Sequence, residues 1–294
     1  MKTVCDLCPR QCNIDRSRMP GYCGMSDEIR IARAGLHMWE EPVISGERGS
    51  GTVFFSGCNL RCVFCQNYSI STGGSGKAVS VARLQEIYQE LIAQGAHNIN
   101  LVTPTHYLKQ ICESLSAPLP VPVVWNSNGY ENVENLKQLE GKVQIYLPDL
   151  KYADNAIAMK YSAAPDYFER ACSAIDEMFR QTGKFEFDSD GMLKRGVIVR
   201  HLILPGQIEN SLRVIDHISS HFSPGDILFG LMRQYTPCGI VSNEKFPELN
   251  RPITDEEYKI VEDHLFASNI EDGYVQDKES ASKQYIPDFD NSGV

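Results

Sequence analysis

The stretch TVFFSGCNLRCVFCQN (52–67) decides the fold of this 294-residue chain, because an apolar strand runs directly into three closely spaced cysteines. These are Cys58, Cys62 and Cys65, in a C-x3-C-x2-C spacing. Thiolates select zinc and iron–sulfur clusters, and structural zinc usually takes four ligands in paired C-x2-C turns. Three thiolates in one loop therefore favour a [4Fe–4S] cluster whose fourth iron stays free for another ligand. A zinc loop and chance clustering are the alternatives.

The rest of the chain repeats the pattern of a strand followed by a helix. The expected strands are 52–57, 98–104, 121–129, 143–151, 196–206 and 226–235, and the expected helices are 80–96, 107–115, 133–141, 166–183, 211–222 and 254–269. This alternation predicts parallel pairing with right-handed crossovers. The predicted fold class is α/β: a partial (β/α)6 TIM-like barrel with an N-terminal Cys-rich metal-binding extension. An open doubly wound sheet is the alternative.

Three segments are expected along the chain. Residues 1–48 form the Cys-rich extension, 49–270 the partial barrel, and 271–294 a polar C-terminal tail that we expect to pack poorly apart from its aromatic residues. The net charge of −10 argues against nonspecific nucleic-acid binding, which depends on neutralising phosphates. No apolar run reaches the length of a membrane span, and MKTVCDLCPR (1–10) lacks an apolar signal segment. We expect a cytoplasmic protein with no nucleic-acid or membrane partner.

A second cysteine group lies near the N-terminus. Cys5, Cys8, Cys12 and Cys23 have the spacing C-x2-C-x3-C-x10-C. Four thiolates in so short a segment predict either a tetrahedral zinc site, which would fold a segment too small for its own core, or an auxiliary [4Fe–4S] cluster. Disulfides are disfavoured in a large chain without a secretory signal.

Polar side chains follow the expected strands at their carboxyl ends, where parallel barrels place their chemistry. They are Thr103, Thr105, Asn126, Ser127, Asn128, Asp149, Lys151, Arg200, His201, Arg233 and Gln234. The structural alternative for each is a loop or strand-end role, such as a salt bridge between Asp149 and Arg200. The remaining thiols Cys112, Cys172 and Cys238 are expected to be buried small apolar groups.

The cysteine loop, with Phe64 just before its last cysteine, resembles the signature of the radical S-adenosylmethionine (SAM) superfamily. The stretches NSNGY (126–130), DLK (149–151), VRHLILPG (199–206) and LMRQYTP (231–237) resemble the glycyl-radical-enzyme activases, in the branch similar to pyruvate formate-lyase activating enzyme. One departure is clear: most of the superfamily has a Gly-Gly-Glu turn after the second strand, where this chain has LVTPTHY (101–107).

The resemblance implies an oxidoreductase that holds a [4Fe–4S] cluster at Cys58, Cys62 and Cys65 and binds SAM at its free iron. One electron cleaves SAM to methionine and a 5′-deoxyadenosyl radical, which abstracts hydrogen from a substrate. A reductant protein such as flavodoxin or ferredoxin would supply the electron. The expected substrate is a glycyl-radical enzyme; the alternative is another protein, a peptide or a small metabolite.

The resemblance also assigns roles to the strand-end residues. The expected SAM-binding residues are Thr103, Thr105, Asn126, Ser127, Asn128, Asp149, Lys151 and Arg200. Related activases bind a monovalent cation near the SAM carboxylate, but Asn126 stands here in place of an Asp. The expected substrate-binding residues are His201, Arg233 and Gln234.

Overall fold

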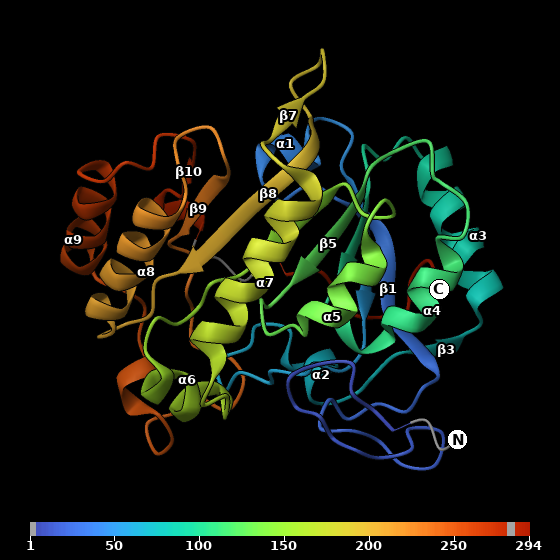
Figure 1. The fold of residues 1–294 in the computed structure, drawn as a ribbon. Coiled ribbons are helices and arrows are strands. Elements are labelled where there is room, and N and C mark those ends of the chain that lie inside the picture. Colours follow the sequence, from blue (N-terminus) through green and yellow to red (C-terminus); the bar gives the residue numbers. More distant parts are fainter. Residues whose placement is uncertain (1–3, 281–285) are drawn as a thin grey trace.

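A single mixed sheet organises the molecule in this computed structural model, which describes residues 4–280 and 286–294 (Figure 1). Its strands are β1 (Ile29–His37), β2 (Ser50–Phe55), β3 (Lys77–Val79), β4 (Ile99–Val102), β5 (Val123–Ser127), β6 (Ile145–Pro148), β7 (Glu186–Phe187), β8 (Leu193–Leu202), β9 (Leu228–Met232) and β10 (Gly273–Val275). They lie in the order β10-β9-β8-β6-β5-β4-β2-β1-β3, with β7 paired to β8. Among the described strands β3 and β10 form the two ends of this order, so the barrel is not closed.

The predicted α/β fold class and partial parallel barrel are confirmed. Strands β2, β4, β5, β6, β8 and β9 pair in parallel, in the order in which they follow along the chain. All of β2, β4, β5 and β6 is buried, as expected for strands covered on both faces. Their carboxyl ends therefore meet at one end of the sheet.

Helices cover the outer face of this parallel sheet. They are α1 (Pro42–Ser45), α2 (Tyr68–Ser71), α3 (Val81–Ala93), α4 (Leu108–Ser114), α5 (Val133–Leu136), α6 (Asn155–Ser162), α7 (Tyr167–Thr182), α8 (Ile208–His221) and α9 (Asp255–Phe266). Figure 1 shows α7 and α8 in front of β8, and α3 and α4 beside β1 and β2. The predicted capping box of the last helix is present, with Thr254 and Glu257 bonded to each other's backbone N–H groups.

Strands β1 and β10, which flank the parallel strands, were not predicted, and neither were the short strands β3 and β7. Strand β1, from the segment expected to be a Cys-rich extension, pairs antiparallel with β2, so residues 29–37 belong to the sheet. Strand β10, from the expected tail, pairs in parallel with β9. The tail is better packed than expected: Phe289 lies edge-to-face on Phe54, with ring centroids 5.3 Å apart.

The last residues of the chain cover part of the free side of β1. The backbone N–H of Ala34 donates to Ser292 O at 2.9 Å, and the N–H of Asn291 donates to Ala32 O at 2.9 Å. Lys77 Nζ donates to Val294 O at 2.8 Å. The last residues of the chain are thus bonded to β1 and to Lys77 at this side of the sheet.

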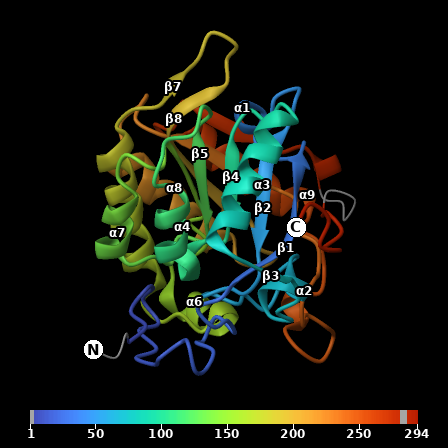
Figure 2. The same cartoon turned by 90° about the vertical axis from the view of Figure 1, so that its right-hand side faces the viewer.

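The N-terminal segment lies at the carboxyl end of the parallel strands. Figures 1 and 2 both show it, in dark blue, at the same end of the molecule as α2 and α6. It has no helix or strand before β1 among the described residues 4–28, and short backbone bonds such as Cys5 N–H to Ile14 O hold its turns. No helix of the described residues is long and apolar enough to cross a bilayer.

Candidate active site at the carboxyl ends of the strands

The three-cysteine loop follows β2 through a glycine turn that only glycine fits. Gly57 has φ +85°, and a Cβ there would lie 2.8 Å from Cys23 O. The N–H of Cys58 donates to the same carbonyl at 3.3 Å. Phe64, before the last cysteine, is buried edge-to-face against Tyr235, with centroids 5.9 Å apart. The loop is therefore held by the N-terminal segment on one side and by the core on the other.

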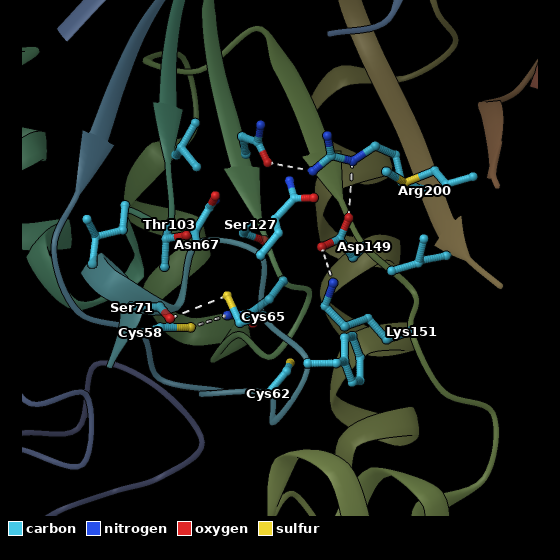
Figure 3. Close-up of a pocket in the computed structure, with 18 of the residues that line it drawn as sticks. Cys58, Cys62, Cys65, Asn67, Ser71, Thr103, Ser127, Asp149, Lys151 and Arg200 are labelled. Carbon is cyan, nitrogen blue, oxygen red and sulfur yellow. Dashed lines mark hydrogen bonds and ion pairs between the residues drawn. The ribbon is translucent and has the colours of Figure 1, made fainter. Parts of the chain in front are cut away.

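Each of the three sulfur atoms accepts a hydrogen bond, and Figure 3 marks the one between Ser71 and Cys65. Asn128 Nδ2 donates to Cys58 Sγ at 3.4 Å, Ser162 Oγ to Cys62 Sγ at 3.1 Å, and Ser71 Oγ to Cys65 Sγ at 3.3 Å. Such donors favour thiolates, whereas burial raises the pKa of Cys62 and raises that of Cys65 to about 12. The thiols of Cys62 and Cys65 thus stay protonated unless a positively charged group replaces the protons.

The three cysteines line one cavity of about 180 Å³ together with polar groups from five strand ends. The predicted residues that line it are Thr103, Asn126, Ser127, Asn128, Asp149, Lys151, Arg200 and Gln234. On β8, strand parity explains the selection, because Arg200 and Leu202 line the cavity and His201 between them does not. The cysteine loop and the strand ends thus meet at this cavity.

A buried ionic network forms the far wall of the cavity from the cysteines (Figure 3). Asp149 bridges Lys151 Nζ at 2.5 Å and Arg200 Nε at 3.1 Å, and the three side chains are 12–16% exposed. Arg200 also donates to Glu40 Oε2 at 3.1 Å and to Asn126 Oδ1 at 2.7 Å. Burial alone would raise the pKa of Asp149, but the charges of Lys151 and Arg200 outweigh it and lower the pKa.

Thr103 has a strained backbone at the position of the superfamily's Gly-Gly-Glu turn. Its φ is +57°, in the left-handed region that a β-branched residue rarely adopts. Its N–H donates to Asn126 O at 2.9 Å, so the pairing of β4 with β5 continues through the strained residue. The chain thus makes a glycine-like turn without glycine and presents Thr103 to the cavity.

Three predicted residues do not line the cavity. Thr105 is buried, and its hydroxyl donates to Glu131 Oε1 at 2.7 Å. His201 is wholly buried between Leu150 O and the hydroxyl of Ser211, at 2.7 and 2.9 Å.

The third is Arg233. Its side chain turns outward to pair with Asp255, and its guanidinium carbon lies 4.2 Å from the centre of the Tyr258 ring. Its neighbour Gln234 lines the cavity instead.

Sequence reasoning missed two carboxylates that the structure brings near this site. Glu40 closes the network on Arg200, and Glu131 lies behind Thr105 with a pKa raised to about 7 by burial. Nothing in the sequence places Glu40 here, because its segment follows the end of β1, which pairs with the start of β2, and so reaches the network from the amino ends of the parallel strands. Glu131 follows NSNGY directly and could have been included with it.

The N-terminal cysteines lie close to one another. A Cβ on Gly21 would lie 3.5 Å from both Cys12 Sγ and Cys23 Sγ. The pKa of the Cys8 thiol is raised to about 12, mainly by burial and to a smaller extent by the neighbouring Cys23 and Cys12 sulfurs. Burial is the main cause of the raised pKa of Cys23, and the nearby Cys5 sulfur adds to it. The four thiols thus lie near one another, and that they hold a metal centre stays a prediction.

The sulfur atoms of neither group converge on a single ion. Among residues 4–280 and 286–294, no three Cys, His, Asp or Glu side chains are arranged so that they could hold one metal ion. A [4Fe–4S] cluster takes each thiolate on a different iron, so its ligands need not meet at one point. The shared cavity and the hydrogen bond to each sulfur fit such a cluster at Cys58, Cys62 and Cys65.

Comparison with known proteins identifies the class. The family model described as the radical SAM superfamily matches residues 52–217, more than half of the chain. The protein therefore belongs to the radical SAM superfamily, whose cofactors are SAM and a [4Fe–4S] cluster.

Individual relatives are more distant. The protein called "Uncharacterized protein MJ0674" of Methanocaldococcus jannaschii is 30% identical over 263 residues, which cover 86% of this chain and 71% of that one. The crystal structure of Streptococcus suis SuiB bound to precursor peptide SuiA is 11% identical over 75% of this chain, with a TM-score of 0.48. Methylornithine synthase (PylB) is 13% identical over 71%, also at 0.48.

The matches cover 46% of the SuiB chain and 59% of the PylB chain, so this chain spans about half the length of these solved structures. At such TM-scores the likeness carries no argument about the substrate.

Proposed function

We propose that this radical SAM protein activates a glycyl-radical enzyme by taking a hydrogen atom from a glycine of a polypeptide. The observation that supports this most is the single cavity in which the cysteine loop faces polar groups from five strand ends. The sheet around it is not closed, which leaves room for a polypeptide loop to reach the strand ends. The sequence resemblance to the activases points the same way. In this superfamily the cluster supplies the electron that splits SAM.

The residues of the cavity suit the two ends of SAM. Lys151 uses one of its three N–H groups on Asp149, so it has donors left for a carboxylate. Asn128 and Ser127 lie on the neighbouring strand end and add hydrogen-bonding groups. The backbone and hydroxyl of Thr103 offer acceptors for an ammonium group. Asp149 and Arg200 orient Lys151, and Gln234 lies at the substrate side of the same cavity.

The cluster hypothesis is tested by replacing Cys58, Cys62 and Cys65 with Ala, one at a time. Each variant is reconstituted with iron and sulfide without oxygen and then reduced in the presence of SAM. We expect each to lose the visible absorbance of the cluster and the release of 5′-deoxyadenosine. Cys172→Ala is the matched control, because Cys172 lies half-buried in α7, away from the cavity. Cleavage of SAM by a variant lacking all three cysteines would contradict the proposal.

The substrate is tested with the reduced protein, SAM and glycyl-radical enzymes from the same cell. We expect the doublet signal of a glycyl radical in electron paramagnetic resonance. If SAM is cleaved, no candidate gains that signal, and another protein, a peptide or a metabolite exchanges deuterium with 5′-deoxyadenosine, the activase proposal is replaced by its alternative. A flavodoxin or ferredoxin is the proposed source of the electron, and it should support turnover in place of a chemical reductant.

We also propose that Cys5, Cys8, Cys12 and Cys23 hold one metal centre, either zinc or an auxiliary cluster. The proximity of the four thiols supports it. Metal is counted in a variant that lacks the three loop cysteines. About one zinc per chain indicates a structural site, and about four irons indicate a second cluster. Neither metal would refute the site.

A further inference from the structure

A second cavity, of about 330 Å³, adjoins the one that holds the cysteine loop. The two share part of their walls, including Asn126, Arg200, Met232 and Gln234. The second cavity extends from these residues toward β1 and β10 and is lined by neither Cys58, Cys62 nor Cys65. A molecule in it would therefore lie beside the cofactor cavity without occupying it.

Two adjacent carboxylates, Glu40 and Glu41, line this second cavity, but only Glu40 has its bonds satisfied. Glu40 accepts from Asn100 at 3.0 Å, from Asn126 at 3.3 Å and from Arg200 at 3.1 Å. The Oε2 atom of Glu41 is buried and has no hydrogen-bond partner among the described residues. Buried polar groups are nearly always paired, so this atom calls for an explanation.

The space around Glu41 is open on the side of β9. A Cβ added to Gly230, which also lines the cavity, would lie 3.7 Å from Glu41 Oε1 and 3.5 Å from Arg200 Cγ. Those are ordinary contacts, so the glycine leaves a gap about one methyl group wide beside the carboxylate. The unpartnered oxygen belongs to a side chain that borders free space.

The charges of this cavity favour a cation. Among the described residues, its lining includes Glu40, Glu41 and Asp277 against one guanidinium, that of Arg200, which is already bonded to Asp149, Glu40 and Asn126. Burial lowers the pKa of His37, a further lining residue, so this imidazole is neutral at pH 7. Glu41 and Asp277 are therefore the acidic residues of the described lining that form no ion pair, and a cation bound beside Glu41 would favour its ionised form.

We propose that the second cavity binds a positively charged ammonium or guanidinium group of the substrate, with Glu41 as its counter-ion. Burying a carboxylate without a hydrogen-bond partner destabilises the folded protein, and a cation that donates a hydrogen bond to it offsets that penalty. Exposed apolar side chains line the mouth: Trp39 is 62% exposed and Val275 41%. They suit the aliphatic stem that carries such a group, as in a lysine or arginine side chain or a small amine. The inference rests on the proposed function in placing substrate beside the cofactor cavity.

The test compares two probes of the same shape. N-acetyl-arginine amide carries the cation, and N-acetyl-citrulline amide replaces it with a neutral urea. Their affinities for the cluster-loaded protein with SAM bound are measured by anaerobic calorimetry. We expect the arginine probe to bind at least about tenfold more tightly, the ratio given by one charged hydrogen bond. Agmatine, a free guanidinium compound, shows whether a small amine suffices or whether the peptide groups add affinity.

Three variants localise the effect. Glu41→Gln should abolish the preference for the charged probe, and Gly230→Ala should weaken binding of both probes by filling the gap. Glu47→Gln, an exposed carboxylate six residues along the same segment, should change neither. The inference is overturned if Glu41→Gln keeps the preference, if it loses SAM affinity as well, or if magnesium or potassium competes with the probe at Glu41. If the wild-type protein prefers the charged probe but never cleaves SAM, the proposed function fails and the cation site stands.

Discussion

At the scale of single residues, this site contains side chains that cost the fold stability. One carboxylate oxygen of Glu41 is buried without a hydrogen-bond partner among the described residues, and Thr103 has a backbone conformation that suits glycine. Such positions are usually retained for function, because packing alone would replace them. Each can be tested by a substitution that removes the unpartnered carboxylate or the backbone strain.

Glu41 should make the stability of the ligand-free protein fall as the pH rises. Burial raises its pKa to about 7, with the nearby charge of Arg200 opposing and those of Glu40 and Asp149 adding to the effect. The folded chain therefore binds a proton that the unfolded chain has released between about pH 4.5 and 7, so stability declines across that interval. Glu41→Gln should raise the thermal midpoint at pH 8 by a few degrees and leave it nearly unchanged at pH 4.5.

Other titrating groups around Glu41 need a control. His37, Tyr274 and Asp277 line the same cavity, and Glu131 has a similarly raised pKa elsewhere. These groups are present in both proteins, so the difference between wild type and Glu41→Gln in the pH dependence of the thermal midpoint reports on Glu41. An equal midpoint shift at both pH values would show that its ionisation is not the cause.

Thr103→Gly should be more stable than Thr103→Ala by about 1 kcal/mol, because only glycine adopts the left-handed backbone without strain. Both substitutions remove the hydroxyl that faces the cavity, so the pair separates backbone strain from side-chain function. Thermal midpoints and SAM affinities of the two variants are compared. Equal stability would show that Thr103 is not strained in solution.

Strand parity separates the correct residue predictions from the incorrect ones. Arg200 and His201 are neighbours on β8, so they point to opposite faces: Arg200 reaches the cavity and His201 is buried against α8. Gln234 and Arg233 differ in the same way. The strand-end rule could predict the row Asn126 to Asn128 and the pair Asp149 and Lys151. It could not predict Glu40 and Glu41, since no sequence signal brings the segment before β2 back to the cavity.

At the scale of elements, the N-terminal segment and the cysteine loop form one unit. Arg10 donates to Asn59 O at 2.8 Å and to Ser162 O at 2.8 Å, and thus joins the segment to the loop and to α6. Cys58 N–H reaches Cys23 O on the same side. The loop's conformation therefore depends on a segment that itself lacks helix and strand.

Arg10→Ala should leave the cluster loop more open and the cluster easier to remove. Losing these hydrogen bonds should destabilise the loop by about 1 kcal/mol or more. We therefore expect the visible absorbance of the cluster to disappear at least about fivefold faster when a chelator is added. Arg18→Ala is the control, because the side chain of Arg18 in the same segment is 77% exposed. Equal rates in the two variants would contradict the coupling of segment and loop.

At the scale of the whole molecule, the parallel strands could be predicted from the sequence, but the strands that flank them on either side could not. Apolar strands alternating with amphipathic helices indicate a parallel sheet wherever they occur. Strands β1 and β10 were missed because their pairing depends on tertiary context: β10 is three residues long, and β1 follows a cysteine-rich segment that suggested an extension.

A chain that lacks residues 289–294 should be less stable and aggregate more readily. It loses the packing of Phe289 on Phe54 and the backbone bonds to β1, which exposes part of that strand's edge. We expect the thermal midpoint to fall by several degrees and light scattering to rise earlier on heating. Ser292→Ala keeps the backbone bonds and should behave as wild type. Unchanged scattering in the shortened chain would show that the edge needs no cover.

The joining of the last residues to β1 bears on how the protein is made. Arg33 donates to Asp288 O across 255 positions of sequence, so β1 leaves the ribosome long before its cover exists. Translation proceeds at roughly 5–20 residues per second, which leaves that strand edge uncovered for on the order of ten seconds or more. During that interval a nascent chain offers a pairing edge to chaperones, or to other nascent chains on the same message.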